Sequence, residues 1–345
     1  MSRVSVIIPV YRCEAMLPAC IDSLLGQTLR DMEFIFVCDG SPDGSLALLE
    51  QARERDARVK VIAFEENRGV SAARNAGLEA AQGDFVGFCD GDDWIEPQMY
   101  ERLLGAALEA GADAAFCRVF KDHEDAQGAL VYREDVPLGF ETGTRFDREA
   151  IRDALIPAML SRPEDSDELP LSGYTPRNLF ARTLAGAHRF RPDIRYAEDL
   201  LYIVECMLDA DAAVAVDEAY YHYRFHAGSV TKRYSPYVPD SHDRSNDALE
   251  ALLAAYPECM RRMVVRRRKM AVTAVRNLCF PGTPYGFAQR VRLARAYMRR
   301  EDVRAWFAQV KPLRFPPRLA LRLLLMKRRM ALTMCALFTF VFDRV

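Results

Sequence analysis

Three carboxylates stand within four residues in the segment Asp90-Gly91-Asp92-Asp93. They directly follow a short hydrophobic run, and a divalent cation would relieve their mutual repulsion. Carboxylate oxygens suit Mg²⁺ or Mn²⁺, whose coordination is commonly completed by phosphate oxygens of a substrate. A calcium loop of the EF-hand type is disfavoured, because Ile95 stands where that loop needs Gly. The segment is therefore a candidate metal site, with a solvated acidic turn as the alternative.

A second polar turn, Asp39-Gly40-Ser41, follows an earlier hydrophobic run. Its carboxylate could accept a hydrogen bond from a base or a ribose, while Gly40 and Gly44 permit tight turns. The alternative is a simple turn that leads into a helix capped by Ser45. Neither a GxGxxG segment after a strand nor a GxxxxGK[ST] segment is present, so dinucleotide and Walker-type phosphate sites are disfavoured.

The predicted elements around these turns alternate between strand and helix. Apolar runs at residues 4–8, 33–38, 59–64 and 85–89 are separated by helical patterns at 15–25, 45–56 and 71–81. Such βαβ units form a parallel sheet covered on both faces, and the ligand sits beyond the carboxyl ends of the strands. We therefore expect Pro9-Val10-Tyr11 and the two polar turns to converge on one crevice.

The later part of the chain continues this mixed pattern and then becomes helical. A helix to residue 110, strands at 114–120 and 220–225, and a helix at 198–208 are predicted, with an acidic, proline-containing loop at 162–173. From residue 239 onward the pattern is helical and basic.

The charge is divided sharply along the chain. Residues 260–345 contain 21 Lys and Arg against three acidic residues, a net charge of +18, whereas the whole chain carries −2, so residues 1–259 carry −20. Apolar residues alternate with the cations from 319 to 342, which is typical of an amphipathic segment on anionic lipid. A helical bundle with solvated cations is the alternative. No nucleic-acid motif accompanies the charge, so we expect no nucleic-acid partner.

The nine cysteines are scattered and form no CxxC pair, which disfavours a zinc ribbon and favours a reducing compartment. The N-terminal residues run straight into the first apolar strand without a signal-peptide pattern. No apolar stretch reaches the roughly 18 residues that a membrane-spanning helix needs. These features predict a cytoplasmic location.

Three segments, in this order, resemble the family-2 inverting glycosyltransferases with the GT-A fold: VSVIIPVY, FVCDGSPDGS and ENRGVSAARNAGLEAAQGDFVGFCDGDDW. The resemblance covers residues 3 to about 120 closely and extends to about 232 more weakly. It implies a Rossmann-like α/β fold with a mostly parallel central sheet flanked by helices, followed here by the C-terminal helical basic extension. It also implies a nucleotide-sugar donor, usually UDP-linked, with a divalent metal (Mn²⁺ or Mg²⁺) on the diphosphate.

The resemblance assigns nucleotide-binding roles to residues of the first two segments and to the start of the third. Pro9, Val10 and Tyr11 would line the nucleoside pocket, and Asp39 matches the acid that contacts uracil. The family often has a second acid just before it, where this chain has Cys38.

The third segment contains two arginines, Arg68 and Arg74. The resemblance implies that both face the nucleotide or its diphosphate. A surface position at the start of a helix is the alternative for Arg68.

The DGDD segment matches the family DxD motif. Asp90, with Gly91, is expected near the ribose, and Asp92 on the metal. Asp93 is expected either to bind the metal directly or to contact the residues that bind it.

Two later segments complete the implied site. Tyr196-Ala197-Glu198-Asp199 resembles the family ED pair, with Asp199 as general base and Glu198 as a supporting or acceptor-contacting group. The alternative is that both acids begin a helix, where the dipole favours them. His226, in YRFHAGSVT, matches a histidine that reaches the metal or the diphosphate, although a lone histidine is more often structural.

The sequence thus predicts a nucleotide-sugar-binding half at 1–120, an acceptor-binding half at 121–235 and a basic, membrane-associating region at 236–345. The implied enzyme is a metal-dependent hexosyl- or N-acetylhexosaminyl-transferase of cell-surface polysaccharide synthesis. It would act on a glycan or lipid-linked glycan at the inner face of the membrane. A non-catalytic nucleotide-sugar-binding or scaffold protein of the same fold is the alternative.

Overall fold

A computed structural model describes residues 3–125, 127–161, 173–225, 234–280, 282–312 and 317–340. The chain forms two compact units, of which the first comprises Met1–Ile156 and Gly173–Ala227 and the second Pro157–Ser172 and Gly228–Val345. His226, which is predicted to reach the metal or the diphosphate, lies outside the described residues.

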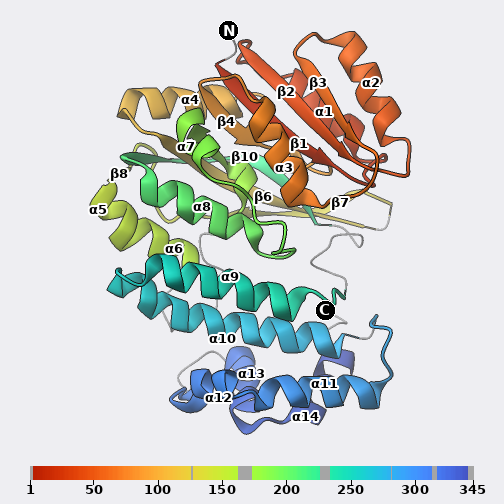
Figure 1. The fold of residues 1–345 in the computed structure, drawn as a ribbon, viewed down its shortest axis with the longest axis vertical. Helices are drawn as coiled ribbons and strands as arrows, with labels where there is room; N and C mark the ends of the chain where they lie inside the picture. Colours follow the sequence, from red (N-terminus) through yellow and green to blue (C-terminus); the bar gives the residue numbers. More distant parts are fainter. Residues whose placement is uncertain are drawn as a thin grey trace. The chain divides into compact units, whose positions relative to one another are not determined.

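The first unit is built on one ten-stranded sheet with the strand order β3-β2-β1-β4-β9-β6-β10-β5, to which β7 adds beside β6 and β8 beside β10 (Figure 1). The strands are β1 (Val4–Val10), β2 (Met32–Asp39), β3 (Val59–Phe64), β4 (Phe85–Phe88), β5 (Trp94–Ile95), β6 (Ala114–Glu124), β7 (Leu130–Val136), β8 (Arg145–Asp147), β9 (Asn178–Ala181) and β10 (Ala212–Phe225). Strands β1 to β4 pair in parallel, as do β6 and β10.

The helices of this unit connect the strands. They are α1 (Leu17–Leu25), α2 (Ser45–Arg55), α3 (Val70–Ala80), α4 (Met99–Ala110), the consecutive turns α5 (Arg148–Ala150) and η1 (Ile151–Leu155), η2 (Thr175–Arg177), α7 (Arg182–Ala187) and α8 (Glu198–Asp209). Helix α6 (Ile156–Leu160) follows η1 and, after its first residue, belongs to the second unit. The expected α/β fold with a helix-flanked sheet is confirmed, and the first four strands end within two residues of their predicted limits.

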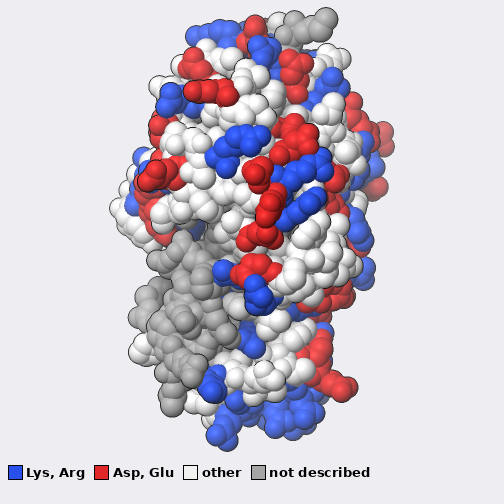
Figure 2. Space-filling view, turned by 90° about the vertical axis from the view of Figure 1, so that its left-hand side faces the viewer, with Lys and Arg blue, Asp and Glu red and all other residues white. Residues whose placement is uncertain are grey.

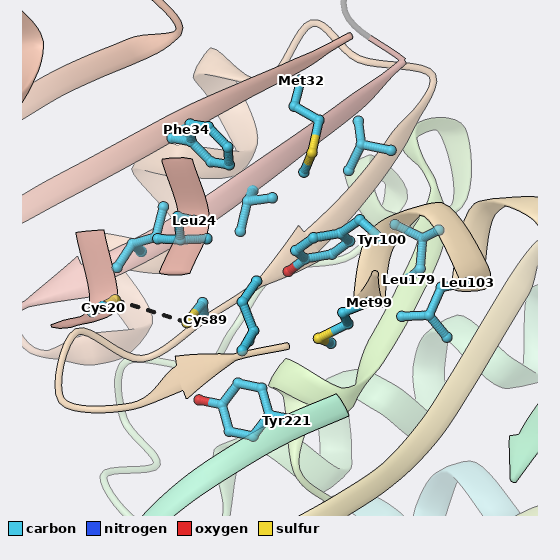
Figure 3. Close-up of a cluster of buried hydrophobic side chains, with 14 of the residues drawn as sticks. Cys20, Leu24, Met32, Phe34, Cys89, Met99, Tyr100, Leu103, Leu179 and Tyr221 are labelled. Atoms are coloured by element: carbon cyan, nitrogen blue, oxygen red, sulfur yellow. Dashed lines mark hydrogen bonds between the residues drawn. The ribbon is translucent and has the colours of Figure 1, made fainter. Parts of the chain in front are cut away.

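Strand β1 is apolar apart from Ser5, and its packing explains this. Alternate side chains, among them Val6 and Ile8, pack with α1 and α4 in the core cluster that Figure 3 shows, which reaches Tyr100. On the opposite face, a Cβ at Gly77 of α3 would lie 2.3 Å from Ile7 Cγ2, so this helix approaches the sheet closely because the position is Gly. Both faces of the strand are therefore buried, as a parallel sheet requires.

The sheet departs from the expected pattern at β9, which runs antiparallel to both β4 and β6. This inversion brings β6 and β10 back to the direction of β1 and β4. Strand β9 is only four residues long and β7 is almost entirely exposed, so neither carries the hydrophobic signal from which strands are predicted.

The second unit is helical. Its helices are α9 (Val238–Leu253), α10 (Pro257–Cys279), α11 (Phe287–Arg299), α12 (Glu301–Ala308), α13 (Pro317–Arg328) and α14 (Ala331–Phe340). Helices α10 to α14 enclose a core that includes Phe307, Met334 and Phe338. The predicted C-terminal helical extension is confirmed, and within the described residues no helix combines the length and apolar character that a bilayer-spanning segment needs.

Candidate active site

The loops after β1, β2 and β4 meet at one edge of the sheet, as expected from the sequence. The backbone NH of Arg12 donates to Ser41 Oγ at 2.8 Å, and that of Gly44 donates to the Glu14 carboxylate at 2.8 Å. A Cβ on Gly91 would lie 3.1 Å from the carbonyl oxygen of Pro9. The three segments therefore lie against one another at the carboxyl ends of the strands, where ligands of such sheets bind.

The nucleoside side of this space contains Pro9, Val10 and Tyr11 at the end of β1. Val10 is buried, Pro9 is half-buried, and the Tyr11 side chain is 42% exposed. Of the three, only Tyr11 presents a largely accessible ring that a base or ribose could contact.

Asp39 ends β2 and organises the neighbouring loop. Its carboxylate accepts hydrogen bonds from the backbone NH of Arg68 at 2.7 Å, the backbone NH of Gly69 at 2.9 Å and the Asn67 side chain at 2.9 Å. Gly40 has a φ of +60°, and a Cβ there would collide with the backbone of Glu66. The observed role of Asp39 is thus to hold this loop, while its contact with a base stays a prediction.

Arg68 is held by this loop at the surface. Its backbone is fixed by Asp39, and its guanidinium lies over the Phe64 ring at 4.5 Å. The side chain is exposed, so it is accessible to an anionic ligand.

Arg74 is buried among carboxylates. Its side chain is only 3% exposed and binds three carboxylates: Asp90 Oδ1 at 2.9 Å, Glu198 Oε1 at 3.2 Å, and Asp199. The guanidinium also packs on the Phe190 ring. Arg74 therefore links the DGDD segment to the ED pair through a buried guanidinium. A direct contact of Arg74 with the nucleotide stays a prediction.

The ED pair begins helix α8 after a strained residue. Ala197 has a φ of +65°, which is unusual for a residue with a Cβ and occurs mostly where a site requires it. The next two residues, Glu198 and Asp199, stand in the first turn of the helix, where the dipole stabilises negative charge. Both acids therefore do begin a helix, as the alternative predicted. This position is compatible with the predicted catalytic role.

The carboxylates around Arg74 influence one another. Burial raises the pKa of Glu198 to about 7, and nearby Asp199 adds to this against the opposing effect of Arg74. Burial likewise raises the pKa of Asp90 to about 6, with Asp199 and Asp92 contributing. Carboxylates outnumber the single guanidinium in this cluster, so it carries excess negative charge.

Divalent metal fits this excess charge and the hard oxygen ligands. Asp92 is half-buried beside Asp90, and its charge contributes to the raised pKa of Asp90. In the part of the chain that the structure describes, no three His, Cys, Asp or Glu side chains are arranged to hold an ion by themselves. That phosphate oxygens of a substrate complete the coordination of an ion at Asp92 stays a prediction from the sequence.

Asp93 lies behind the site. It is 1% exposed, and its two oxygens accept hydrogen bonds from the Tyr221 hydroxyl at 2.5 Å and from the backbone NH of Arg224 at 2.8 Å. The same Tyr221 oxygen accepts from the backbone NH of Asp90 at 3.2 Å. Of the two roles predicted for Asp93, this buried position favours support of the metal-binding residues over direct binding of the metal.

Two residues that support the site, Tyr221 and Asn75, were not predicted from the sequence. Tyr221 belonged to an aromatic strand without an assigned role. Asn75, next to Arg74, exchanges two hydrogen bonds of 2.9 Å with the backbone of Phe190 and so ties the segment before the ED pair to α3. The ARN sequence could have indicated it, since a buried amide on a helix needs partners.

Comparisons with known proteins agree with this arrangement. The sequence profile described as Glycosyl transferase family 2 matches residues 5–160. The chain is 32% identical over 312 residues to the uncharacterized glycosyltransferase EpsJ of Bacillus subtilis, covering 87% of this chain and 86% of the relative.

Two solved structures are similar in fold. Residues 1–349 of TarS from S. aureus, in complex with UDP-GlcNAc, superpose with a TM-score of 0.56 at 18% identity, covering 100% of this chain and 92% of that one. The mannosyltransferase PcManGT of Pyrobaculum calidifontis, in complex with GDP-Man and Mn²⁺, gives a TM-score of 0.50 at 16% identity, covering 99% and 88%.

Proposed function

Because the chain belongs to glycosyl transferase family 2, we propose that it transfers a sugar, with inversion, from a nucleotide sugar to a hydroxyl of a glycan or lipid-linked glycan in surface polysaccharide synthesis. One observation carries the proposal: Arg74 brings the DGDD segment and the ED pair together although they are more than 100 residues apart. An acidic turn and a helix start with no shared task would not need this buried bridge.

The donor is proposed to be a UDP-sugar. Tyr11 and Arg68 are the accessible groups of the nucleoside side, and the Asp39 loop positions Arg68. TarS, which shares the fold, binds UDP-GlcNAc. The three strand-end loops leave the diphosphate beside Asp90 and Asp92.

A divalent cation, Mn²⁺ or Mg²⁺, is proposed to be held by Asp92 with Asp90 close by, and by His226 if that residue reaches the site. When bound, the ion would stabilise charge on the departing diphosphate. The similar PcManGT was solved with Mn²⁺. Asp93 would fix the loop through Tyr221, so that Asp92 stays oriented.

Asp199 is proposed as the general base. It would accept the proton of the acceptor hydroxyl as the oxygen forms its bond to the anomeric carbon and the bond from that carbon to the diphosphate breaks. Attack from the side opposite the leaving group inverts the anomeric centre. Arg74 would hold the Asp199 carboxylate in place, and Glu198, whose pKa is about 7, would hydrogen-bond the acceptor in either protonation state.

The test is release of UDP from UDP-sugars in the presence of Mn²⁺, compared between the wild type and Asp199→Asn. We expect the variant to lose at least 100-fold in rate while keeping donor binding, measured as a donor-induced rise in melting temperature. Asp209→Asn is the matched control, since Asp209 ends the same helix at the surface. Full activity of Asp199→Asn would refute the base, and binding without turnover by the wild type would assign a non-catalytic role.

The second unit is proposed to dock on an anionic membrane surface from the cytoplasmic side. Lys and Arg side chains gather at the lower end of the view in Figure 2, where α11 to α14 lie. In the segment of α13 and α14, Leu321, Leu324, Met330 and Leu332 are 38%, 38%, 43% and 56% exposed, and Arg322, Lys327, Arg328 and Arg329 belong to the same stretch of chain. Exposed apolar side chains beside cations suit the interface of an anionic bilayer.

Vesicle co-sedimentation tests this docking. The protein should bind vesicles containing phosphatidylglycerol and release them at high salt, but not bind pure phosphatidylcholine. Leu324→Gln with Leu332→Gln should weaken binding, whereas Leu108→Gln, an equally exposed leucine of the first unit, should not. Equal binding by all three proteins would exclude the surface.

A further inference from the structure

We propose that a cavity of about 310 Å³ beside Trp94 binds a neutral sugar ring of the acceptor, an inference that rests on the proposed glycosyl transfer. The cavity lies entirely within the first unit. Its walls come from α1, β5, β6, β7 and β10 and include Trp94, Asp122, Glu124, Leu130, Arg133 and Arg224. None of these residues belongs to the nucleotide, metal or base groups described above.

The cavity shares a wall with the DGDD segment. Trp94 directly follows Asp93, and the backbone NH of Arg224 donates to the Asp93 carboxylate at 2.8 Å. Strands β6 and β10 run in the direction of β1 and β4, so Glu124 and Arg224 stand at the same carboxyl edge of the sheet as the donor loops. A molecule in the cavity would therefore lie beside the place where a sugar is transferred.

The aromatic wall is held rigidly. The Trp94 ring stacks on the ring of His222, with centroids 3.4 Å apart and planes 12° apart. His222 is fully buried, and its two ring nitrogens lie 2.9 Å from Asp122 and 3.0 Å from Glu96. The Arg133 guanidinium also lies over the Trp94 ring, 5.7 Å from its centroid. Where it lines the cavity, this fixed indole offers a sugar ring an apolar surface at little entropic cost.

The polar wall consists of two ion pairs. Arg133 donates to both oxygens of Asp122 at 2.6 and 3.1 Å, and Arg224 lies 3.1 Å from Glu124. Among the described residues that line the cavity, two cations face two anions, so this part of the wall carries no net charge that would attract a phosphate or a carboxylate. Charged groups fixed in this way make strong hydrogen bonds to hydroxyl groups, as donors and as acceptors.

The combination of features selects the ligand class. Small-molecule sites begin at roughly 300 Å³, so this cavity suits one ring rather than a nucleotide sugar. An indole surface beside balanced donors and acceptors matches a ring with apolar CH groups and several hydroxyls. That ligand is a neutral hexose or N-acetylhexosamine unit, which in this position would belong to the acceptor.

Fluorescence can test the site directly, because the chain has only two tryptophans, Trp94 and Trp306. Trp306→Phe, in the second unit, leaves Trp94 as the sole tryptophan emitter. Methyl glycosides of glucose, galactose and N-acetylglucosamine are the probes. At least one should change the emission saturably at millimolar concentration, whereas inorganic phosphate should not. No response to any of the three glycosides, or an equal response to phosphate, would overturn the proposal.

Variants identify the cavity as the binding place. In the Trp306→Phe background, Glu124→Gln and Arg133→Lys should each weaken glycoside binding five- to tenfold. Glu134→Gln is the matched control, since Glu134 neighbours Arg133 on β7 but pairs with Lys121 rather than lining the cavity. Equal affinity in all three variants would overturn the assignment.

Donor turnover separates this inference from the proposed function. Slow hydrolysis of the UDP-sugar without acceptor should be unchanged in Glu124→Gln, because the cavity does not hold the donor. If glycosides bind but no UDP-sugar is bound or hydrolysed, the transferase proposal fails while the sugar site stands. If the donor is hydrolysed but no glycoside binds, the cavity proposal fails alone.

Discussion

Arg74 and Asp90 are joined by a hydrogen bond of 2.9 Å between the buried guanidinium and the first carboxylate of the DGDD segment. The other terminal nitrogen of the guanidinium contacts Glu198 and Asp199. One side chain of α3 thus sets the relative position of the group proposed to lie near the ribose and of the proposed base. Burial lowers the pKa of Arg74, but the three carboxylates outweigh this effect and raise it overall, so the bridge stays charged.

The first prediction concerns this bridge. Arg74→Lys keeps the positive charge, but the ammonium group of lysine lacks the planar set of NH donors with which the guanidinium contacts three carboxylates. We expect kcat to fall by about 10²–10³, as when a preorganised electrostatic group is lost, with a smaller change in the donor KM. Initial rates of UDP release measure both constants. Arg68→Lys is the comparison, and it should raise the donor KM more than it lowers kcat. The same effect from both variants would show that Arg74 acts on the donor.

The second prediction concerns metal removal. The carboxylates near Arg74 leave excess negative charge, so EDTA should abolish transfer and Mn²⁺ or Mg²⁺ should restore it. Asp92→Asn should raise the metal concentration needed for half-maximal activity at least tenfold, whereas Asp43→Asn, on the neighbouring loop, should not. Unchanged activity after exhaustive chelation would contradict the metal assignment.

The first hundred residues were predictable because their elements are regular and apolar. Strands such as β1 are buried on both faces, and the turns after them carry the polar residues, so sequence order alone places Asp39 and Asp90 at one edge. The contact between Arg74 and Asp199 was not predictable, because it depends on how the segment before α8 packs on α3 through Asn75 and Phe190. Long-range packing of this kind leaves no periodic pattern in the sequence.

The exposed strand β7 was missed for a related reason. Its residues are nearly all exposed, three of them in a row are charged (Arg133, Glu134 and Asp135), and only pairing with β6 makes the segment a strand. The cavity beside Trp94 depends on this strand, so it could not be inferred from the sequence.

The third prediction concerns Tyr221, which holds Asp93 and receives the backbone NH of Asp90. Tyr221→Phe leaves both groups buried without this partner. The free energy of unfolding should fall by about 1–3 kcal/mol, as for a lost buried hydrogen bond. Urea unfolding measures it, and Tyr132→Phe, an exposed tyrosine of β7, is the control. A loss no larger than that of the control would mean that the loop does not depend on this hydroxyl.

The fourth prediction concerns acid stability. Burial tends to raise the pKa of Asp43, but hydrogen bonds from Ser41, Ser45 and Glu14 outweigh it and lower the pKa from 3.8 to about 2. A depressed folded-state pKa adds stability above the unfolded value, and this contribution is lost as the pH falls from about 4 to about 2. The side chain is half-buried, so we expect a contribution on the order of 1 kcal/mol.

Urea unfolding between pH 2 and pH 6 tests this contribution. The difference between the wild type and Asp43→Asn should be largest near pH 6 and shrink toward pH 2. Asp22→Asn, an exposed aspartate of α1, should give a difference that varies less with pH. A constant difference for Asp43→Asn would contradict the assigned hydrogen bonds.

The fifth prediction concerns two cysteines of the second unit. The sulfur atoms of Cys279 in α10 and Cys335 in α14 lie 2.7 Å apart in the apolar core. The hydrogen bond from Cys279 lowers the pKa of Cys335 against the effect of burial, and Arg290 contributes. The thiolate of one residue can therefore displace a thiolate from an oxidised disulfide reagent, and the second cysteine can then close the protein disulfide.

We expect oxidised glutathione to link Cys279 to Cys335 once slow opening of the helices admits it, with two molecules of reduced glutathione released. Peptide mapping by mass spectrometry identifies the link. Closing a loop of this length should raise the unfolding free energy by roughly 4 kcal/mol, and Cys335→Ser should abolish the gain. The pair Cys20 and Cys89 is the internal comparison and should stay reduced, because its sulfur atoms lie farther apart, at 3.9 Å, and the hydrogen bond with Cys20 together with burial raises the pKa of Cys89. Linkage of Cys20 to Cys89 without linkage of Cys279 to Cys335 would contradict the prediction.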